Sequence, residues 1–119
     1  MATKILVVED DPINLDYILI VLKSQKKFSI SSATNGTSAL EIFDKEKPDI
    51  LLLDIRLPDI DGIQVMKKIK EKSPETIIIA QTAHALQNDE RIILQSGFDD
   101  FIAKPMRPAT IISTINKYL

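Results

Sequence analysis

The chain has 119 residues and a formal net charge of −2; 45% of its residues are hydrophobic and 27% are charged. This size and composition predict a single globular domain over residues 1–119, without the positive charge typical of proteins that bind nucleic acid directly or anionic membranes. Cysteine is absent, which excludes disulfides, thiolate metal sites and cysteine nucleophiles. The first apolar run is too short for a signal peptide or for membrane insertion, so a cytoplasmic protein is expected.

Short apolar runs alternate with segments of helical periodicity. The five runs are Lys4–Val8, Phe28–Ala33, Ile50–Leu53, Thr76–Gln81 and Phe101–Ala103. The first, third and fourth are apolar throughout, as buried parallel strands are, whereas the second alternates and the fifth is short, which suits sheet edges. With right-handed crossovers, the predicted fold is α/β: a (βα)5 doubly wound, flavodoxin-like parallel sheet of five strands in the order 2-1-3-4-5.

Capping residues mark the expected helices. Asp11 is the expected N-cap of the first helix, with Pro12 at its first position, and Gly97 closes a fourth helix that ends at Ser96. Asn35-Gly36 and Asp61-Gly62 precede the second and third helices. The apolar stripes contain Leu15, Ile18, Leu19 and Leu22; Ala39, Leu40 and Phe43; Val65, Met66 and Ile69; and Ile111, Ile112, Ile115 and Leu119. The lysines of the third helix are expected to form a solvated face: Lys67, Lys68, Lys70 and Lys72.

Polar residues stand directly behind the apolar runs. Glu9 and Asp10 follow the first run and Asp54 follows the third. In an open parallel sheet, functional groups collect at the carboxyl ends of the strands, and the order 2-1-3-4-5 puts the ends of strands one and three side by side. The three carboxylates should therefore converge. Such a cluster repels itself unless a cation neutralises it, and hard oxygen ligands favour Mg²⁺ or Mn²⁺.

These residues, with those that follow the later strands, resemble the receiver domain of two-component response regulators, and the resemblance covers essentially the whole chain. It implies that Asp54 accepts a phosphoryl group, with Thr82 and Lys104 assisting. It also implies a cis peptide bond before Pro105 and a switch role for Thr82 and for the aromatic Phe101.

The resemblance further implies the ligands of a bound cation. Asp10 and Asp54 would bind Mg²⁺ or Mn²⁺ directly, Arg56 through its backbone carbonyl, and Glu9 through a metal-bound water. Other residues would flank the site: the Arg56 side chain, Ala83, His84 and Pro105. Gln81 stands where the family usually has an apolar residue, and the sequence does not explain it.

The implied function is that of a phosphoacceptor switch in a two-component system or phosphorelay. The phosphoryl donor would be the phosphohistidine of a sensor histidine kinase or a histidine phosphotransfer protein. Phosphorylation would change the face made by the fourth helix, fifth strand and fifth helix. The domain would catalyse only its own phosphorylation and dephosphorylation. Residues 10–14 and 82–85 are most similar to receivers of hybrid sensor kinases, and both a stand-alone relay protein and a domain of a larger kinase remain open, as does the oligomeric state.

Other functions fit the same residues less well. A phosphorylation-independent interaction module would usually lack Asp54 or Lys104, and both are present. A haloacid-dehalogenase-like phosphatase needs an aspartate two residues after its nucleophile, where this chain has Arg56. An EF-hand with Gly62 at its sixth position would put Leu57 and Lys68 at ligand positions. A flavodoxin-like cofactor binder would need a phosphate-binding loop after the first strand, where the acidic residues repel phosphate.

Overall fold

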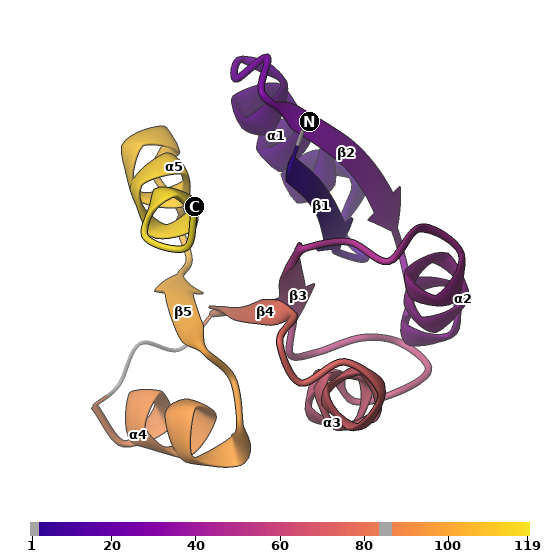
Figure 1. The fold of residues 1–119 in the computed structure, drawn as a ribbon. Coiled ribbons are helices and arrows are strands. Elements are labelled where there is room, and N and C mark those ends of the chain that lie inside the picture. Colours follow the sequence, from indigo (N-terminus) through magenta and orange to yellow (C-terminus); the bar gives the residue numbers. More distant parts are fainter. Residues whose placement is uncertain (1–2, 84–86) are drawn as a thin grey trace.

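The computed structural model describes residues 3–83 and 87–119, along which five strands alternate with five helices (Figure 1). The elements are β1 (Thr3–Val8), α1 (Pro12–Lys23), β2 (Phe28–Ala33), α2 (Gly36–Glu46), β3 (Ile50–Asp54), α3 (Gly62–Lys72), β4 (Ile77–Thr82), α4 (Gln87–Ser96), β5 (Asp100–Ala103) and α5 (Pro108–Asn116). Each predicted strand agrees with the observed one to within about a residue at either end, the usual uncertainty of such boundaries. In the described ranges, no helix is both long and apolar enough to cross a membrane.

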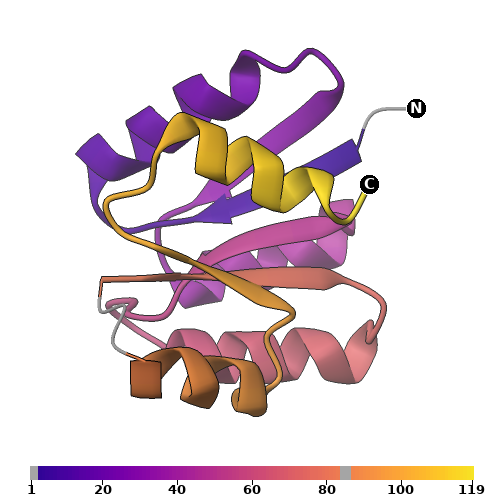
Figure 2. The same ribbon diagram turned by 90° about the vertical axis from the view of Figure 1, so that its left-hand side faces the viewer.

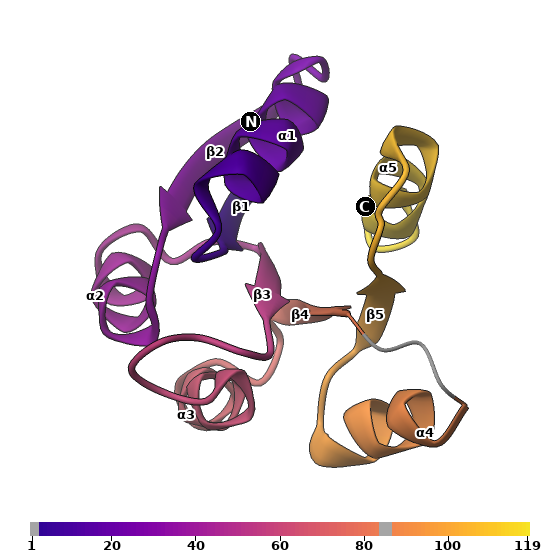
Figure 3. The same cartoon turned by 180° about the vertical axis from the view of Figure 1, so that it is seen from behind.

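The sheet has the predicted topology. Its strands are parallel and lie in the order β2-β1-β3-β4-β5, so the alternating strand β2 and the short strand β5 form the two edges. Helices α1 and α5 cover one face, and α2, α3 and α4 cover the other (Figure 1, and from behind in Figure 3). Figure 2 shows α5 lying in front of the strands. The chain reverses its winding between β1 and β3, which makes their ends the topological switch point.

Side chains define where the helices begin. Asp11, Asn35 and Asp61 are the N-caps of α1, α2 and α3, and each accepts a hydrogen bond from a backbone N–H of the first turn. Gly97, directly after α4, has a φ of +123°, a conformation that residues with a side chain rarely adopt. The capping predictions are therefore confirmed for the described residues.

The core is divided by the sheet into two clusters, one under each helical layer. Most predicted stripe residues lie in these clusters, and Leu19, Leu40 and Ile112 pack against them while partly buried. The prediction for Leu119 is wrong, because α5 ends at Asn116 and the Leu119 side chain, beyond the helix, is 56% exposed.

The predicted solvated face of α3 is wrong at one position. The side chains of Lys67, Lys68 and Lys72 are exposed, but Lys70 is partly buried. Its Nζ donates to the backbone oxygen of Thr76 at 2.7 Å and to Oδ2 of Asp99 at 2.8 Å. Because Lys70 lies in the last turn of α3, its long side chain reaches the carbonyls of the loop that follows the helix.

Candidate functional site

The candidate site is built on one row of the sheet. Asp54 on β3 pairs in register with Gln81 on β4, and Glu9 follows the last residue of β1 at the same level. The residues two positions earlier on these strands belong to the core cluster beneath α1 and α5: Val7, Leu52 and Ile79. Side chains two positions apart on a strand point to the same face. Glu9, Asp54 and Gln81 therefore lie together above that apolar cluster.

A glycine fixes the approach of α3 to this row. A Cβ atom at Gly62 would lie 2.7 Å from Cα of Ile55 and would collide with the backbone oxygen of Asp54. The Gly62 N–H donates to the backbone oxygen of Ile55 at 2.8 Å. Since only a residue without a side chain fits here, the start of α3 packs directly against the end of β3 and holds Asp54 in place.

Three carboxylates converge at the ends of β1 and β3. Glu9, Asp10 and Asp54 each offer one oxygen, and these oxygens all lie within 4.8 Å of one another. Glu9 is completely buried and Asp54 is 6% exposed, whereas Asp10 faces solvent. The prediction that these three carboxylates lie close together is confirmed. The donor set consists of hard oxygens alone, which fits Mg²⁺ or Mn²⁺ and not a metal that prefers nitrogen or sulfur.

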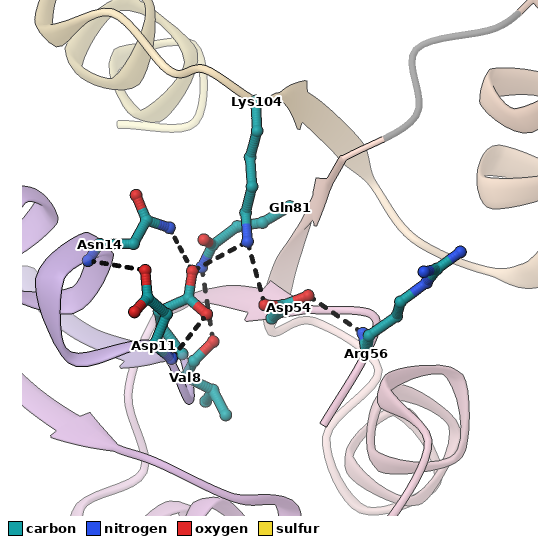
Figure 4. Close-up of polar contacts among 8 residues, drawn as sticks. Val8, Asp11, Asn14, Asp54, Arg56, Gln81 and Lys104 are labelled. Carbon is teal, nitrogen blue, oxygen red and sulfur yellow. Dashed lines mark hydrogen bonds and ion pairs between the residues drawn. The ribbon is translucent and has the colours of Figure 1, made fainter. Parts of the chain in front are cut away.

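One ammonium group lies between two of the carboxylates. Lys104, which follows β5, places Nζ 3.0 Å from Oε1 of Glu9 and 3.1 Å from Oδ2 of Asp54 (Figure 4). Burial alone would lower the pKa of Lys104, but the hydrogen bond that it donates to Glu9 and the charge of Asp54 raise the pKa above its ordinary value. The peptide bond between Lys104 and Pro105 is cis, as predicted.

Glu9 is the most enclosed of the three acids. It accepts hydrogen bonds from the side-chain amide of Asn14 and, at 3.3 Å, from the backbone N–H of Asp11. Burial opposes its ionisation, but the hydrogen bonds with Asp54, Lys104 and Asn14 outweigh that effect and lower the pKa of Glu9 to about 2. Glu9 is therefore a permanent negative charge at neutral pH.

The Asp54 carboxyl has the opposite shift. Burial and the neighbouring Glu9 carboxylate raise its pKa to about 6. Two groups oppose this shift: the backbone N–H of Arg56, which donates to Oδ1 at 3.0 Å, and the positive charge of Lys104. Of this coupled pair, Asp54 is the group that takes up a proton first, because a second buried negative charge beside Glu9 is unfavourable. At neutral pH it is mainly ionised.

Of the other predicted residues, Thr82 and Ala83 lie past the row of Asp54 and Gln81, whereas Phe101 lies one position before it. Thr82 ends β4, is buried and pairs in register with Ala103; Ala83 follows it and is exposed. Phe101 on β5 is partly buried and packs against the cluster under α2, α3 and α4. His84 lies outside the described residues.

The Arg56 side chain, expected to flank the site, is exposed and extends away from the acidic residues in Figure 4. The sequence reasoning missed Asn14 and the direct ion pair between Lys104 and Glu9. The position of Asn14 carried a usable signal: with Asp11 as N-cap, it lies in the first turn of α1, close to the end of β1.

A cavity of about 820 Å³ lies at the opposite edge of the sheet, where β1, β3 and β4 begin. Its lining includes an ion pair between Lys72 and Asp44, whose atoms are 3.1 Å apart. Both acidic and basic residues line it, and among the described residues the carboxylates that come close enough to share a metal ion lie at the carboxyl edge instead. The chemistry of the chain is therefore concentrated at the carboxyl edge.

Comparison with known proteins agrees with this geometry. The family model described as the response regulator receiver domain matches residues 5–116. The polar-differentiation response regulator DivK of Brucella anthropi is 32% identical, over 100% of this chain and 98% of its own length. The hybrid signal transduction histidine kinase L of Dictyostelium discoideum is 36% identical over 97% of this chain, which spans only 7% of that kinase.

A solved receiver domain has the same fold. The receiver domain of the sensor histidine kinase PA1611 from Pseudomonas aeruginosa PAO1 has a TM-score of 0.88 and 32% sequence identity, covering 99% of this chain and 98% of that one. That structure is described with a magnesium ion coordinated in its active site cleft.

Proposed function

Because the chain belongs to the family of response regulator receiver domains, we propose that it is one receiver domain in which Asp54 accepts a phosphoryl group from the phosphohistidine of a histidine kinase or histidine phosphotransfer protein. The observation that carries this assignment is the position of Asp54, a buried carboxylate that is paired with the Lys104 ammonium and lies beside Glu9. The raised pKa of Asp54 still leaves its carboxylate ionised at neutral pH, as a nucleophile requires.

A divalent cation fits the three carboxylates. We assign Asp10 and Asp54 as direct ligands, the backbone carbonyl of Arg56 as a third, and Glu9 as a partner through a bound water. The support is the convergence of three hard oxygens within 4.8 Å and the magnesium ion reported for the PA1611 receiver. Bound Mg²⁺ would offset the charge that gathers on the transferred phosphoryl oxygens.

The residues of this chain supply the remaining steps. A carboxylate oxygen of Asp54 attacks phosphorus, the new oxygen–phosphorus bond forms, and the nitrogen–phosphorus bond to the donor histidine breaks, leaving the electron pair on the imidazole. Lys104 exchanges its ion pair with the carboxylate for one with a phosphoryl oxygen. Thr82 donates a hydroxyl hydrogen bond to another phosphoryl oxygen, and Phe101 then changes its packing. The surface formed by α4, β5 and α5 carries the change to a partner.

The test is chemical phosphorylation. Phosphoramidate with Mg²⁺ should add one phosphoryl group to the wild-type protein, measured by intact mass spectrometry, and EDTA should prevent the reaction. Asp54→Asn should abolish labelling, whereas Asp16→Asn, a matched change at an exposed position of α1, should leave it intact. Equal labelling of Asp54→Asn and wild type would contradict the proposal and would favour a module that acts without phosphorylation at this residue.

A further inference from the structure

Gln81 is a buried polar residue that the reaction described above does not use. It lies in β4 and is completely buried, with Ile102 beside it in register on β5. Its Nε2 donates one long hydrogen bond, of 3.5 Å, to the backbone oxygen of Val8. Its Oε1 accepts no hydrogen bond from the residues that the structure describes. A buried polar atom without a partner lowers stability, so its presence in a core calls for a physical explanation.

The direction of the Gln81 side chain shows which part of the molecule its amide reaches. Val8 belongs to β1, and β3 lies between β1 and β4. The Gln81 side chain therefore crosses β3 at the level of Asp54. In Figure 4 the Gln81 side chain passes the end of Lys104, and a dashed line joins its amide to Val8. Its amide thus ends beside the last residue of β1, directly before Glu9, and its oxygen is an acceptor without a partner among the described residues.

Lys104 needs such an acceptor when the site is loaded. Its two recorded hydrogen bonds go to Glu9 and Asp54, two of the three carboxylates that would surround a divalent cation. An ammonium and a divalent cation held by the same carboxylates repel each other. Lys104 must therefore give up part of these contacts, and an ammonium with three N–H donors is costly to leave unpaired in a partly buried place.

We propose that Gln81 is a positioning residue whose Oε1 accepts a hydrogen bond from Lys104 when a divalent cation occupies the acidic cluster. The inference rests on the proposed function, since it requires a cation beside Asp54. Its consequence is that Gln81 favours cation binding at the expense of the stability of the empty site. A side chain with the same reach but without the amide should reverse both effects.

The first experiment compares Gln81→Met with wild type. Mg²⁺ affinity measured by titration calorimetry should fall on the order of tenfold, as expected for the loss of one hydrogen bond to a charged group. In EDTA, the melting temperature of the variant should rise, because the unpaired oxygen is gone. Gln64→Met, at an exposed position of α3, is the matched control and should change neither quantity. Gln81→Leu serves as a second variant if the methionine packs poorly.

The second experiment asks whether Gln81 acts through Lys104. In a Lys104→Met background, Gln81→Met should leave the Mg²⁺ affinity unchanged, because the ammonium that needs the acceptor is absent. An unchanged affinity of Gln81→Met in the wild-type background would overturn the role of Gln81, and so would an equal loss in both backgrounds. If the wild-type protein neither binds Mg²⁺ nor is labelled at Asp54, the proposed function fails as well. Labelling at Asp54 with unaltered Mg²⁺ affinity in the variant overturns only the role of Gln81.

Discussion

Lys104 at the carboxyl edge of the sheet and Lys70 near the amino edge are both partly buried, but their surroundings differ. Lys70 has three acceptors for its three N–H groups: the backbone oxygens of Pro74 and Thr76 and the carboxylate of Asp99. Asp99 in turn accepts from the backbone N–H of Ile78 at 2.8 Å. One positive charge meets one negative charge, and the donors are satisfied. This network is complete without a ligand.

The network around Lys104 is incomplete by the same criteria. One ammonium meets the carboxylates of Glu9 and Asp54, and Asp10 adds a third negative charge within 4.8 Å. A buried amide oxygen, that of Gln81, has no partner among the described residues. Structural networks balance their charges and hydrogen bonds, whereas a binding site retains an imbalance that its ligand corrects. The difference between the two lysines thus separates a structural contact from a functional one.

The largest expected effect tests that distinction directly. In EDTA, Lys70→Met and Lys104→Met should each lower the free energy of unfolding by on the order of 2 kcal/mol, because each leaves carboxylate charge without its partner. With Mg²⁺ present, the stability of Lys104→Met should approach that of the wild-type protein under the same conditions, since a cation replaces the missing positive charge. Lys70→Met should remain less stable than the wild-type protein by the same amount as in EDTA. Urea denaturation with and without Mg²⁺ measures both values.

Lys68→Met provides the control for this comparison. It lies on α3 with Lys70, its side chain is exposed, and the substitution should change stability by less than about 0.5 kcal/mol. If Mg²⁺ stabilises the wild-type protein but does not restore the free energy of unfolding of Lys104→Met, a bound cation does not compensate the excess negative charge at the carboxyl edge.

A second test uses pH in the absence of cations. The pKa of Asp54 is raised to about 6 in the folded protein, above its ordinary value near 3.8. Between these values the folded state binds more protons than the unfolded state, so this group makes the protein less stable as pH rises from about 4 to about 6. The expected loss is on the order of 1–2 kcal/mol, and Asp54→Asn should remove it.

Thermal melts in EDTA across that pH range measure this effect. The lowered pKa of Glu9 acts in the opposite sense: its contribution is present above pH 4.5 and is lost as pH falls toward 2. The range from pH 5 to pH 7 therefore reports mainly on Asp54. If the stability of the wild-type protein rises over this range, and that of Asp54→Asn rises equally, then the ionisation of Asp54 does not destabilise the folded protein.

The sequence predicted the parts of this molecule that depend on strand order. Strand ends in a parallel sheet meet at one edge, so the convergence of Glu9, Asp10 and Asp54 followed from the apolar runs alone. The position of Asn14 near the end of β1 was predictable from the N-cap Asp11, but the hydrogen bond of its side chain to Glu9 and the contacts of Lys70 were not. Each depends on how a helix is rotated and how far it reaches past its end, and periodicity gives neither. Gln81 was unexplained by the sequence for the same reason, because its role depends on what lies across β3.

The smallest expected effect compares two tyrosines. Tyr17 on α1 donates from its hydroxyl to the backbone oxygen of Met106 at 2.6 Å and so fastens the loop that carries Lys104. Tyr118 donates to the backbone oxygen of Asp99 at 3.1 Å, at the edge where Lys70 binds. Tyr17→Phe and Tyr118→Phe each remove one hydroxyl and should each lower the free energy of unfolding by about 1 kcal/mol.

The two variants should differ in their effect on the site. Tyr17→Phe frees the loop after β5, so the Lys104 ammonium is held less firmly beside Glu9 and Asp54, and Mg²⁺ affinity should change by about twofold, the equivalent of a few tenths of a kcal/mol. Tyr118→Phe acts at the opposite edge of the sheet and should leave that affinity unchanged. Titration calorimetry on both variants decides the matter. Equal changes in Mg²⁺ affinity would mean that the two edges are coupled through the sheet, and that Lys104 is not positioned by its own loop.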